Sequence, residues 1–239
     1  MLDPTVGPDQ AKPADSPAAD CCGEVDPRIA HHFNNRLAEL MVDGKLPEMV
    51  DVSQMLLGLL TDVGSQTPSL LELGCGSGAL AVELLSRGAV RADGIDLSPD
   101  MIDAARRRAD EAGVGDRATF ELGDGALVKL DAHDWVVLDR VICCYPNVES
   151  LLANATRAAT HRVAFSVPTS RGWRGVVNKV GWTLENIPTW LRHQSCPTFV
   201  HDIRRIERVL AGAGFARARE DHLGLWYAAV WERSAAGNT

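Results

Sequence analysis

Three short stretches of the chain place glycines or carboxylates directly after an apolar run. The first is ELGCGSGA at residues 72–79, and the others are Asp96 and the pair Gly123-Asp124. Glycines in such a turn let a ligand approach backbone N–H groups at the start of a helix, where electron-rich groups are favoured. A carboxylate at the end of a strand can accept hydrogen bonds from both hydroxyls of a ribose. The pattern predicts a site for a ligand that contains a nucleoside.

The spacing of the glycines separates two classes of nucleotide site. Gly74, Gly76 and Gly78 form G-x-G-x-G. The dinucleotide pattern G-x-G-x-x-G needs its third glycine one place later. A nicotinamide-dependent oxidoreductase is therefore the less favoured interpretation.

A fourth stretch, DRVICCYPN at residues 139–147, ends an apolar run with two cysteines, a tyrosine and a proline. If strand geometry continues through it, Cys143 and Cys144 point to opposite faces, so at most one of them contacts a ligand. Buried cysteines commonly pack as small hydrophobes, and a reactive thiol needs a lowered pKa. Tyr145 is one of only two tyrosines and lies where a phenol could orient a substrate hydroxyl.

Alternating strands and helices position these stretches. Apolar patterns predict strands at residues 69–74, 91–96, 117–124, 134–142 and 162–168, with helices at 79–88, 98–113 and 149–160 between them. A helix at 201–215 and strands at 216–222 and 224–233 follow. Parallel neighbours need long crossovers, so the alternation predicts a doubly wound, Rossmann-like α/β fold. The carboxyl ends of its strands meet at one edge, where the ligand-type residues converge.

The segments that flank this core differ in character. Residues 1–20 hold four prolines and little to bury, which predicts a disordered tail. We expect one domain from residue 21 to 233, with residues 234–239 as a C-terminal tail. Within it, a helix is expected between Pro47 and Val63, where apolar residues recur at helical spacing.

Residues 169–198 form a segment with a separate pattern. Trp173, Val176, Val177, Val180, Leu184 and Ile187 space as one apolar face of a helix. Such a helix either packs on the sheet or caps a substrate. We treat the segment as a candidate substrate cap.

Composition excludes some classes of protein. The chain has 239 residues and a formal net charge of −8, which disfavours nucleic acid as a partner. No window approaches the ~20 apolar residues of a membrane span, and the N-terminus lacks the features of a signal peptide. We therefore expect a cytoplasmic protein. None of its six cysteines makes a CxxC pair, so no metal site is expected.

The motifs LLELGCGSGAL, GIDLSPDMI and ELGDG resemble the cofactor motifs of the class I S-adenosylmethionine-dependent methyltransferases, over about residues 50–233. The resemblance implies S-adenosylmethionine as the cofactor and a seven-stranded sheet whose last strand is antiparallel. It also implies the cofactor-binding residues, which we take to be Glu72, Gly74, Cys75, Gly76 and Gly78 around the amino-acid part, Asp96 at the ribose, Leu97 and Met101 beside the adenine, Gly123 and Asp124 at its amino group, and Asp139 after the fourth strand.

A looser likeness links GALAVELLSRGA and VLDRVICCYP to the magnesium-protoporphyrin O-methyltransferases. In those enzymes a His–Tyr pair follows the fourth strand. This chain has Cys144-Tyr145 there, which departs from that pattern at the position of the catalytic base.

Methyl transfer from a sulfonium is an in-line displacement, so the main task of an enzyme is to position donor and acceptor. A general base adds ~10²–10⁴-fold if the acceptor is a hydroxyl. We expect Tyr145 to orient such a hydroxyl. His32, with its neighbour His31, and His201 are the candidate bases, although a lone histidine is more often structural.

The resulting hypothesis is methylation of a small, partly hydrophobic molecule, with oxygen preferred as the acceptor atom. We expect a short N-terminal helix containing His31, His32 and Phe33. This helix and the tryptophan-rich segment with Trp173, Trp182 and Trp190 are expected to enclose that molecule. Two alternatives stay open. One is a cofactor-binding module without methyl transfer. The other is methylation of arsenite or another soft acceptor at a thiol cluster to which Cys21 and Cys22 contribute.

Overall fold

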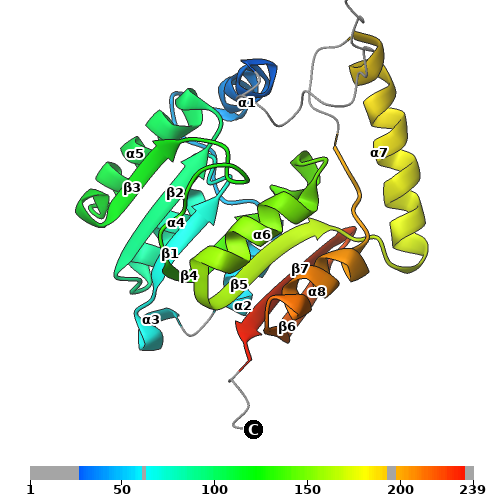
Figure 1. Cartoon of the computed structure of the whole chain (residues 1–239). Helices are drawn as coiled ribbons and strands as arrows, with labels where there is room; N and C mark the ends of the chain where they lie inside the picture. The colour runs from blue at the N-terminus through cyan, green and yellow to red at the C-terminus, as the bar shows by residue number, and fades with distance from the viewer. Residues whose placement is uncertain (1–26, 61–62, 193–197, 235–239) are drawn as a thin grey trace, which may run out of the picture.

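A computed structural model describes residues 27–60, 63–192 and 198–234 of the chain. The strands are β1 (Ser69–Leu73), β2 (Arg91–Asp96), β3 (Ala118–Leu122), β4 (His133–Asp139), β5 (Ala159–Pro168), β6 (Phe215–Leu223) and β7 (Trp226–Arg233). They form one seven-stranded sheet in the order β3-β2-β1-β4-β5-β7-β6 (Figure 1). The first five strands are parallel to their neighbours, and β7 is antiparallel to β5 and β6. The predicted doubly wound sheet and its antiparallel last strand are confirmed.

Helices cover both faces of the sheet. They are α1 (Pro27–Leu40), α2 (Asp51–Leu59), α3 (Val63–Gln66), α4 (Ala79–Ser86), α5 (Pro99–Glu111), α6 (Val148–Ala158), α7 (Gly172–Arg192) and α8 (Ile203–Gly212), with short 3-10 turns at Gly115–Arg117 and Ile142–Cys144. Apolar side chains of α2, α4 and α5 form one buried cluster with one face of the sheet. Those of α6 and α8 form a second cluster on the opposite face. The chain order reverses between β1 and β4, which is where a doubly wound sheet opens a crevice for ligands.

Local signals explain where several helices begin. Ser98 precedes α5, and its hydroxyl accepts a hydrogen bond from the Met101 N–H at 3.1 Å, with Pro99 at the first helical position. Asp202 caps α8 in the same way by accepting from the Arg204 N–H at 3.0 Å. The start of α5 beside Asp96 is thus determined by residues next to it in sequence.

Several predicted boundaries were wrong, including that of the strand predicted at 162–168, which begins at Ala159. The fourth strand ends at Asp139 rather than residue 142, and Ile142–Cys144 is a 3-10 turn. The helix expected at 149–160 ends at Ala158, because β5 already begins at Ala159. The helix expected between Pro47 and Val63 is the shorter Asp51–Leu59. Apolar runs alone do not mark such ends, since a buried strand, turn or helix can all be apolar.

Some predictions concern residues that lie outside the described part of the chain. These are the N-terminal tail, Cys21, Cys22, Cys196 and residues 235–239. Among the described residues, no helix is both long enough and apolar enough to cross a membrane.

Candidate cofactor and acceptor site

A cavity of about 430 Å³ opens at the carboxyl ends of the parallel strands. Its lining residues come from α1, the loop before α2, the glycine loop and the segments that follow β2, β3 and β4. Most of the predicted cofactor residues are among them, namely Glu72, Gly74, Cys75, Gly76, Asp96, Leu97, Met101, Gly123, Asp124 and Asp139. The fold therefore brings together groups that are up to 67 residues apart in sequence, from Glu72 to Asp139.

The glycine loop between β1 and α4 uses its three glycines differently. All three have positive φ, +70° at Gly74, +50° at Gly76 and +72° at Gly78. A Cβ at Gly74 would lie 2.4 Å from a Val141 methyl, and one at Gly78 would lie 2.9 Å from the Ala105 Cβ. A Cβ at Gly76 would meet only the Met101 sulfur, at 4.0 Å. Gly76 therefore leaves open space on the cavity side, where a ligand can approach the backbone.

Asp96 connects the glycine loop to the start of α5. Its carboxylate accepts hydrogen bonds from the Gly76 N–H at 2.8 Å and from the Ser98 N–H at 2.9 Å. Burial raises the pKa of Asp96, and these backbone hydrogen bonds oppose the increase. The carboxylate is held in one orientation at the cavity wall.

Two more acids lie at the ends of β1 and β4. Glu72 is 5% exposed and accepts a hydrogen bond from the Ala81 N–H at 3.1 Å. Burial, and next the negative charge of Asp139, raise the pKa of Glu72 well above its ordinary value. Asp139 accepts hydrogen bonds from the Ser166 hydroxyl at 2.5 Å and from the Ser53 hydroxyl. This concentration of carboxylates in a buried place favours a ligand that carries positive charge.

Asp124 and Tyr145 form a direct link between the segments after β3 and β4. The Tyr145 hydroxyl donates to Asp124 Oδ1 at 2.9 Å, and the Ala126 N–H donates to the same oxygen at 2.8 Å. Burial, and next the charge of Asp124, raise the pKa of Tyr145. The phenol thus stays neutral at physiological pH and acts as a hydrogen-bond donor or acceptor.

The segment after β4 differs from the predicted continuation of the strand. Arg140 has φ of +53°, and its N–H donates to the Ser166 hydroxyl at 2.9 Å. The two thiols do not lie on opposite faces of a strand, because Cys143 and Cys144 both approach the Arg140 carbonyl, at 3.3 and 3.9 Å. Cys144 lines the cavity, whereas Cys143 is 5% exposed and packs behind it. A hydrogen bond from Cys144 lowers the pKa of Cys143.

The candidate bases occupy different places. His32 on α1 lines the cavity. His201 does not; its Nε2 donates to the Tyr145 carbonyl at 2.8 Å, and its ring stacks on Phe199 with centroids 5.8 Å apart. Burial lowers the pKa of His201, which keeps the ring neutral. The contact made by His201 holds the turn that carries Tyr145.

None of the described side chains of the predicted substrate cap, residues 169–198, is among the residues that line the cavity. Trp173 is 70% exposed, and the side chain of Trp190 lies outside what the structure describes. The apolar wall comes instead from α1 and the loop after it, with Phe33, Leu40, Pro47, Met49 and Val50.

Sequence reasoning also missed several polar residues of the site, including Glu48. Arg36 and Arg140 line the cavity, and Ser53 reaches Asp139 from α2. The only sequence signal for Arg140 was its position directly after Asp139. Arg36 and Ser53 belong to helices whose docking cannot be deduced from local patterns.

Comparisons with known proteins agree with this geometry. Residues 70–163 match the family model described as a methyltransferase domain. Magnesium protoporphyrin IX methyltransferase from Synechocystis PCC 6803, solved with bound SAH, superposes with a TM-score of 0.65 at 20% identity and covers 86% of this chain and 98% of its own. An O-methyltransferase family protein from Burkholderia thailandensis has a TM-score of 0.66 at 18% identity, with 87% of this chain and 60% of that one covered.

Curated relatives match over a shorter length. Ribosomal protein L11 methyltransferase from Pasteurella multocida (strain Pm70) is 37% identical over 103 residues, which are 41% of this chain and 34% of the relative. The same-named protein from Yersinia pestis is 42% identical over 64 residues, or 27% of this chain and 22% of the relative. The match thus spans about a fifth to a third of the length of these relatives.

Proposed function

Because residues 70–163 are a methyltransferase domain within the class I methyltransferase fold, we propose that this protein transfers a methyl group from S-adenosylmethionine to a small molecule. We further propose that the acceptor is partly hydrophobic, that the accepting atom is oxygen, and that the cytoplasm is the compartment. The observation that carries the proposal is the set of buried carboxylates around an open glycine loop.

The charge of the cavity supports this cofactor over a dinucleotide. Glu72, Asp96 and Asp139 line it at three adjacent strand ends. A pyrophosphate would be repelled by these carboxylates, whereas a ligand with an ammonium and a sulfonium group would neutralise them. In this assignment Glu72 and Asp139 contact the amino-acid part of the cofactor.

The remaining cofactor contacts follow from the same placement. We assign the ribose hydroxyls to Asp96, whose carboxylate is already oriented by the Gly76 and Ser98 N–H groups. Leu97 and Met101 provide apolar contacts for the adenine beside it. Asp124 Oδ1 accepts from Tyr145 and Ala126, so we assign the adenine amino group to Oδ2.

The acceptor would occupy the part of the cavity between α1 and the turn after β4. Its walls there combine apolar side chains, such as Phe33 and Met49, with His32 and Arg140. An apolar pocket with a few polar groups suits a partly hydrophobic small molecule.

When bound, S-adenosylmethionine supplies an electrophilic methyl group on a sulfonium. The residues of the chain then have three tasks: they orient the acceptor, exclude water and receive a proton. Holding reactants in line can supply ~7–11 kcal/mol of the barrier. We assign orientation to the neutral Tyr145 hydroxyl and proton removal to His32, which lines the cavity. His201 is a positioning residue, because it holds the Tyr145 backbone rather than facing the cavity.

The test is to incubate the purified protein with methyl-labelled S-adenosylmethionine and a metabolite extract, and to locate the label by mass spectrometry. Label in a small molecule with the wild type, and none with Asp96→Ala, supports the proposal. Cofactor binding without labelled product in any metabolite or protein overturns it and favours a binding module.

A further inference from the structure

Five of the described apolar side chains of helix α7 are exposed to solvent. Trp173, Val176, Val177, Val180 and Leu184 are 70, 62, 46, 55 and 61% exposed. At 3.6 residues per turn these positions fall within an arc of about 100° on one side of the helix. A helix of a globular protein normally turns such a stripe toward the core. In Figure 1, α7 stands at the edge of the molecule, outside the helices that cover the sheet.

The opposite side of α7 carries the buried Gly175 and Asn178 together with the half-buried Trp182 and Asn186. Asn178 is 3% exposed, and its Nδ2 donates to the carbonyls of Thr169 and Leu225, both at 2.8 Å. Asn186 exchanges hydrogen bonds with the backbone of Thr198, at 2.8 and 3.1 Å. These contacts satisfy backbone groups that apolar side chains could not.

Gly175 adds a steric reason for this orientation. A Cβ there would lie 2.2 Å from the Ser170 carbonyl carbon, so no larger residue fits between the helix and the loop before it. Rotating α7 by 180° about its axis would place larger side chains of the apolar stripe at this close approach. It would also move Asn178 away from the carbonyls to which it donates. The apolar stripe therefore faces outward because of specific contacts on the other side.

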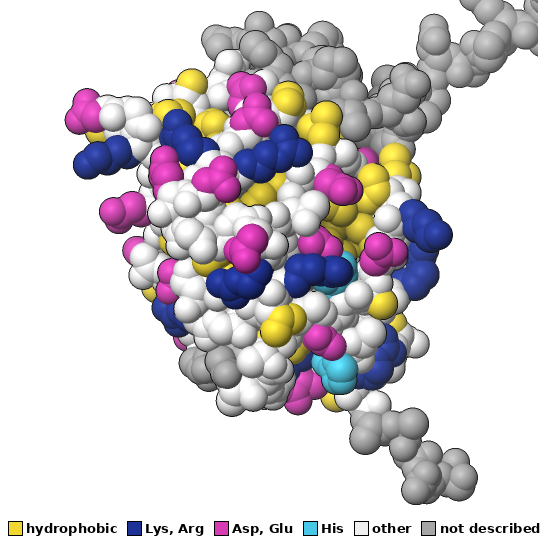
Figure 2. All heavy atoms as spheres, turned by 90° about the vertical axis from the view of Figure 1, so that its left-hand side faces the viewer, with side chains coloured by type: hydrophobic (Ala, Val, Ile, Leu, Met, Phe, Trp, Pro, Cys, Tyr) yellow, Lys and Arg dark blue, Asp and Glu magenta, His cyan; other side chains and the backbone are white. Residues whose placement is uncertain are grey.

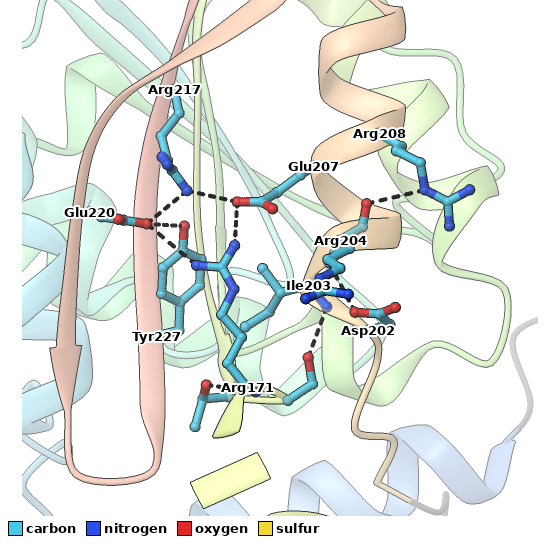
Figure 3. A network of polar contacts seen from close by, with 11 residues as sticks. Arg171, Asp202, Ile203, Arg204, Glu207, Arg208, Arg217, Glu220 and Tyr227 are labelled. Carbon is cyan, nitrogen blue, oxygen red and sulfur yellow. Dashed lines mark hydrogen bonds and ion pairs between the residues drawn. The ribbon is translucent and has the colours of Figure 1, made fainter. Parts of the chain in front are cut away.

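The start of α7 is also held in place by an ionic network (Figure 3). Arg171, directly before the helix, pairs with Glu207 of α8 at 2.7 Å and approaches Glu220 of β6 at 3.7 Å. Its guanidinium lies 5.1 Å from the centre of the Tyr227 ring. Arg217 joins both glutamates, at 2.9 and 3.0 Å. The network couples the helix to the end of the sheet.

Charge around α7 differs from the charge of the whole protein. Arg174 and Lys179 flank the apolar stripe. The sequence of α7, residues 172–192, contains three Lys or Arg against one acid, Glu185, although the chain has a net charge of −8. On the face that carries α5 and β3, by contrast, charges of both signs are interspersed (Figure 2).

We propose that α7 binds the surface of an anionic lipid bilayer and lies flat on it, with its apolar stripe among the acyl chains and its basic flanks at the headgroups. A one-sided apolar stripe with tryptophan and with Lys or Arg beside it is the pattern of interfacial helices. Anionic lipid attracts each nearby basic residue. In a pair of α7 helices from two copies, Arg174 and Lys179 would instead bring like charges to the contact.

The experiment is flotation of the full chain with vesicles of phosphatidylcholine, with and without phosphatidylglycerol. We expect binding to the anionic vesicles that weakens as salt is raised. Val180→Glu should reduce this binding at least about tenfold, because it removes apolar contact and adds a repelled charge. Val90→Glu is the matched control: Val90 is 51% exposed, against 55% for Val180, and lies between α4 and β2.

Three results would overturn the proposal. They are no flotation of the wild type with anionic vesicles, equal loss in both glutamate variants, and a dimer in light scattering that Val180→Glu dissociates. The last result would assign the stripe to a second copy of the chain. Circular dichroism of each variant checks that the fold is intact.

Discussion

The two halves of the cavity are built in different ways. On the cofactor half, after β1, β2 and β3, the ligand-type groups are backbone N–H groups and carboxylates held by them, such as Asp96 with Gly76 and Ser98. On the acceptor half, after β4 and along α1, the groups are side chains such as His32 and Arg140, which are exposed. The proposed cofactor site is therefore held by local backbone contacts, whereas the proposed acceptor site depends on how separate elements dock.

The contact between α1 and the core illustrates the difference. Asn34 accepts a hydrogen bond from Ser98, and Leu37 packs in a small cluster with Met101 and Ala104. Fewer buried residues form this cluster than either of the two that pack against the sheet. Elements with few buried contacts open at low free-energy cost, which suits a wall that must admit an acceptor.

The largest effect is expected on the cofactor half. Asp96→Ala should weaken S-adenosylmethionine binding by at least about 100-fold in calorimetry, since hydrogen bonds to a charged group are worth ~1.5–3 kcal/mol each. Asp100→Ala, an exposed acid in the first turn of α5, should bind within about threefold of wild type. Equal losses in both variants would contradict a specific role for Asp96.

Glu72→Gln tests how much the buried acid lowers the free energy of unfolding. A raised pKa means that the folded state holds the proton more tightly than the unfolded state. The free energy of unfolding without cofactor should therefore decrease as pH rises above about 4.5, the ordinary pKa of glutamate. Glutamine cannot ionise but keeps an acceptor for the Ala81 N–H, so the variant should be more stable at pH 8 by ~1–3 kcal/mol. Urea denaturation from pH 5 to 8 measures both, and an unchanged pH slope would contradict the assignment.

Tyr145→Phe tests the acceptor half. It should lower kcat about tenfold through loss of orientation, while the Kd for the cofactor changes by less than about threefold. Because the pKa of Tyr145 is raised, wild-type activity should show no tyrosine ionisation below its ordinary value of about 10. Tyr227→Phe is the matched control, since its hydroxyl donates to Glu220 away from the cavity. A larger effect on Kd than on kcat would move Tyr145 to the cofactor half.

The smallest effect is expected for Cys144→Ser. Activity should stay within about twofold of wild type, as for Cys143→Ser, because both thiols contact the Arg140 carbonyl as packing groups. Activity lost in Cys144→Ser and kept in Tyr145→Phe would instead identify a soft acceptor such as a trivalent arsenical.

The cofactor half was largely predictable because its signals are local. The glycine spacing, the cap at Ser98 and the end of each short strand are all determined by residues that are neighbours in sequence. A parallel sheet then brings the carboxyl ends of its strands to one edge, independently of the conformation of the loops. Residues as far apart as Gly74 and Asp124 were therefore placed together correctly before any contact was known.

The sequence by itself determined the elements, their alternation and four carboxylates that line the cavity, namely Glu72, Asp96, Asp124 and Asp139. Only the tertiary structure decided that the chain turns at Arg140, that His201 contacts the Tyr145 carbonyl, that α1 lines the cavity and that α7 exposes its apolar stripe. The apolar pattern of α7 is the same whether that face is buried or exposed. Its orientation depends on the close approach of Gly175 to Ser170 and on the hydrogen bonds of Asn178 to Thr169 and Leu225, which the apolar pattern does not encode.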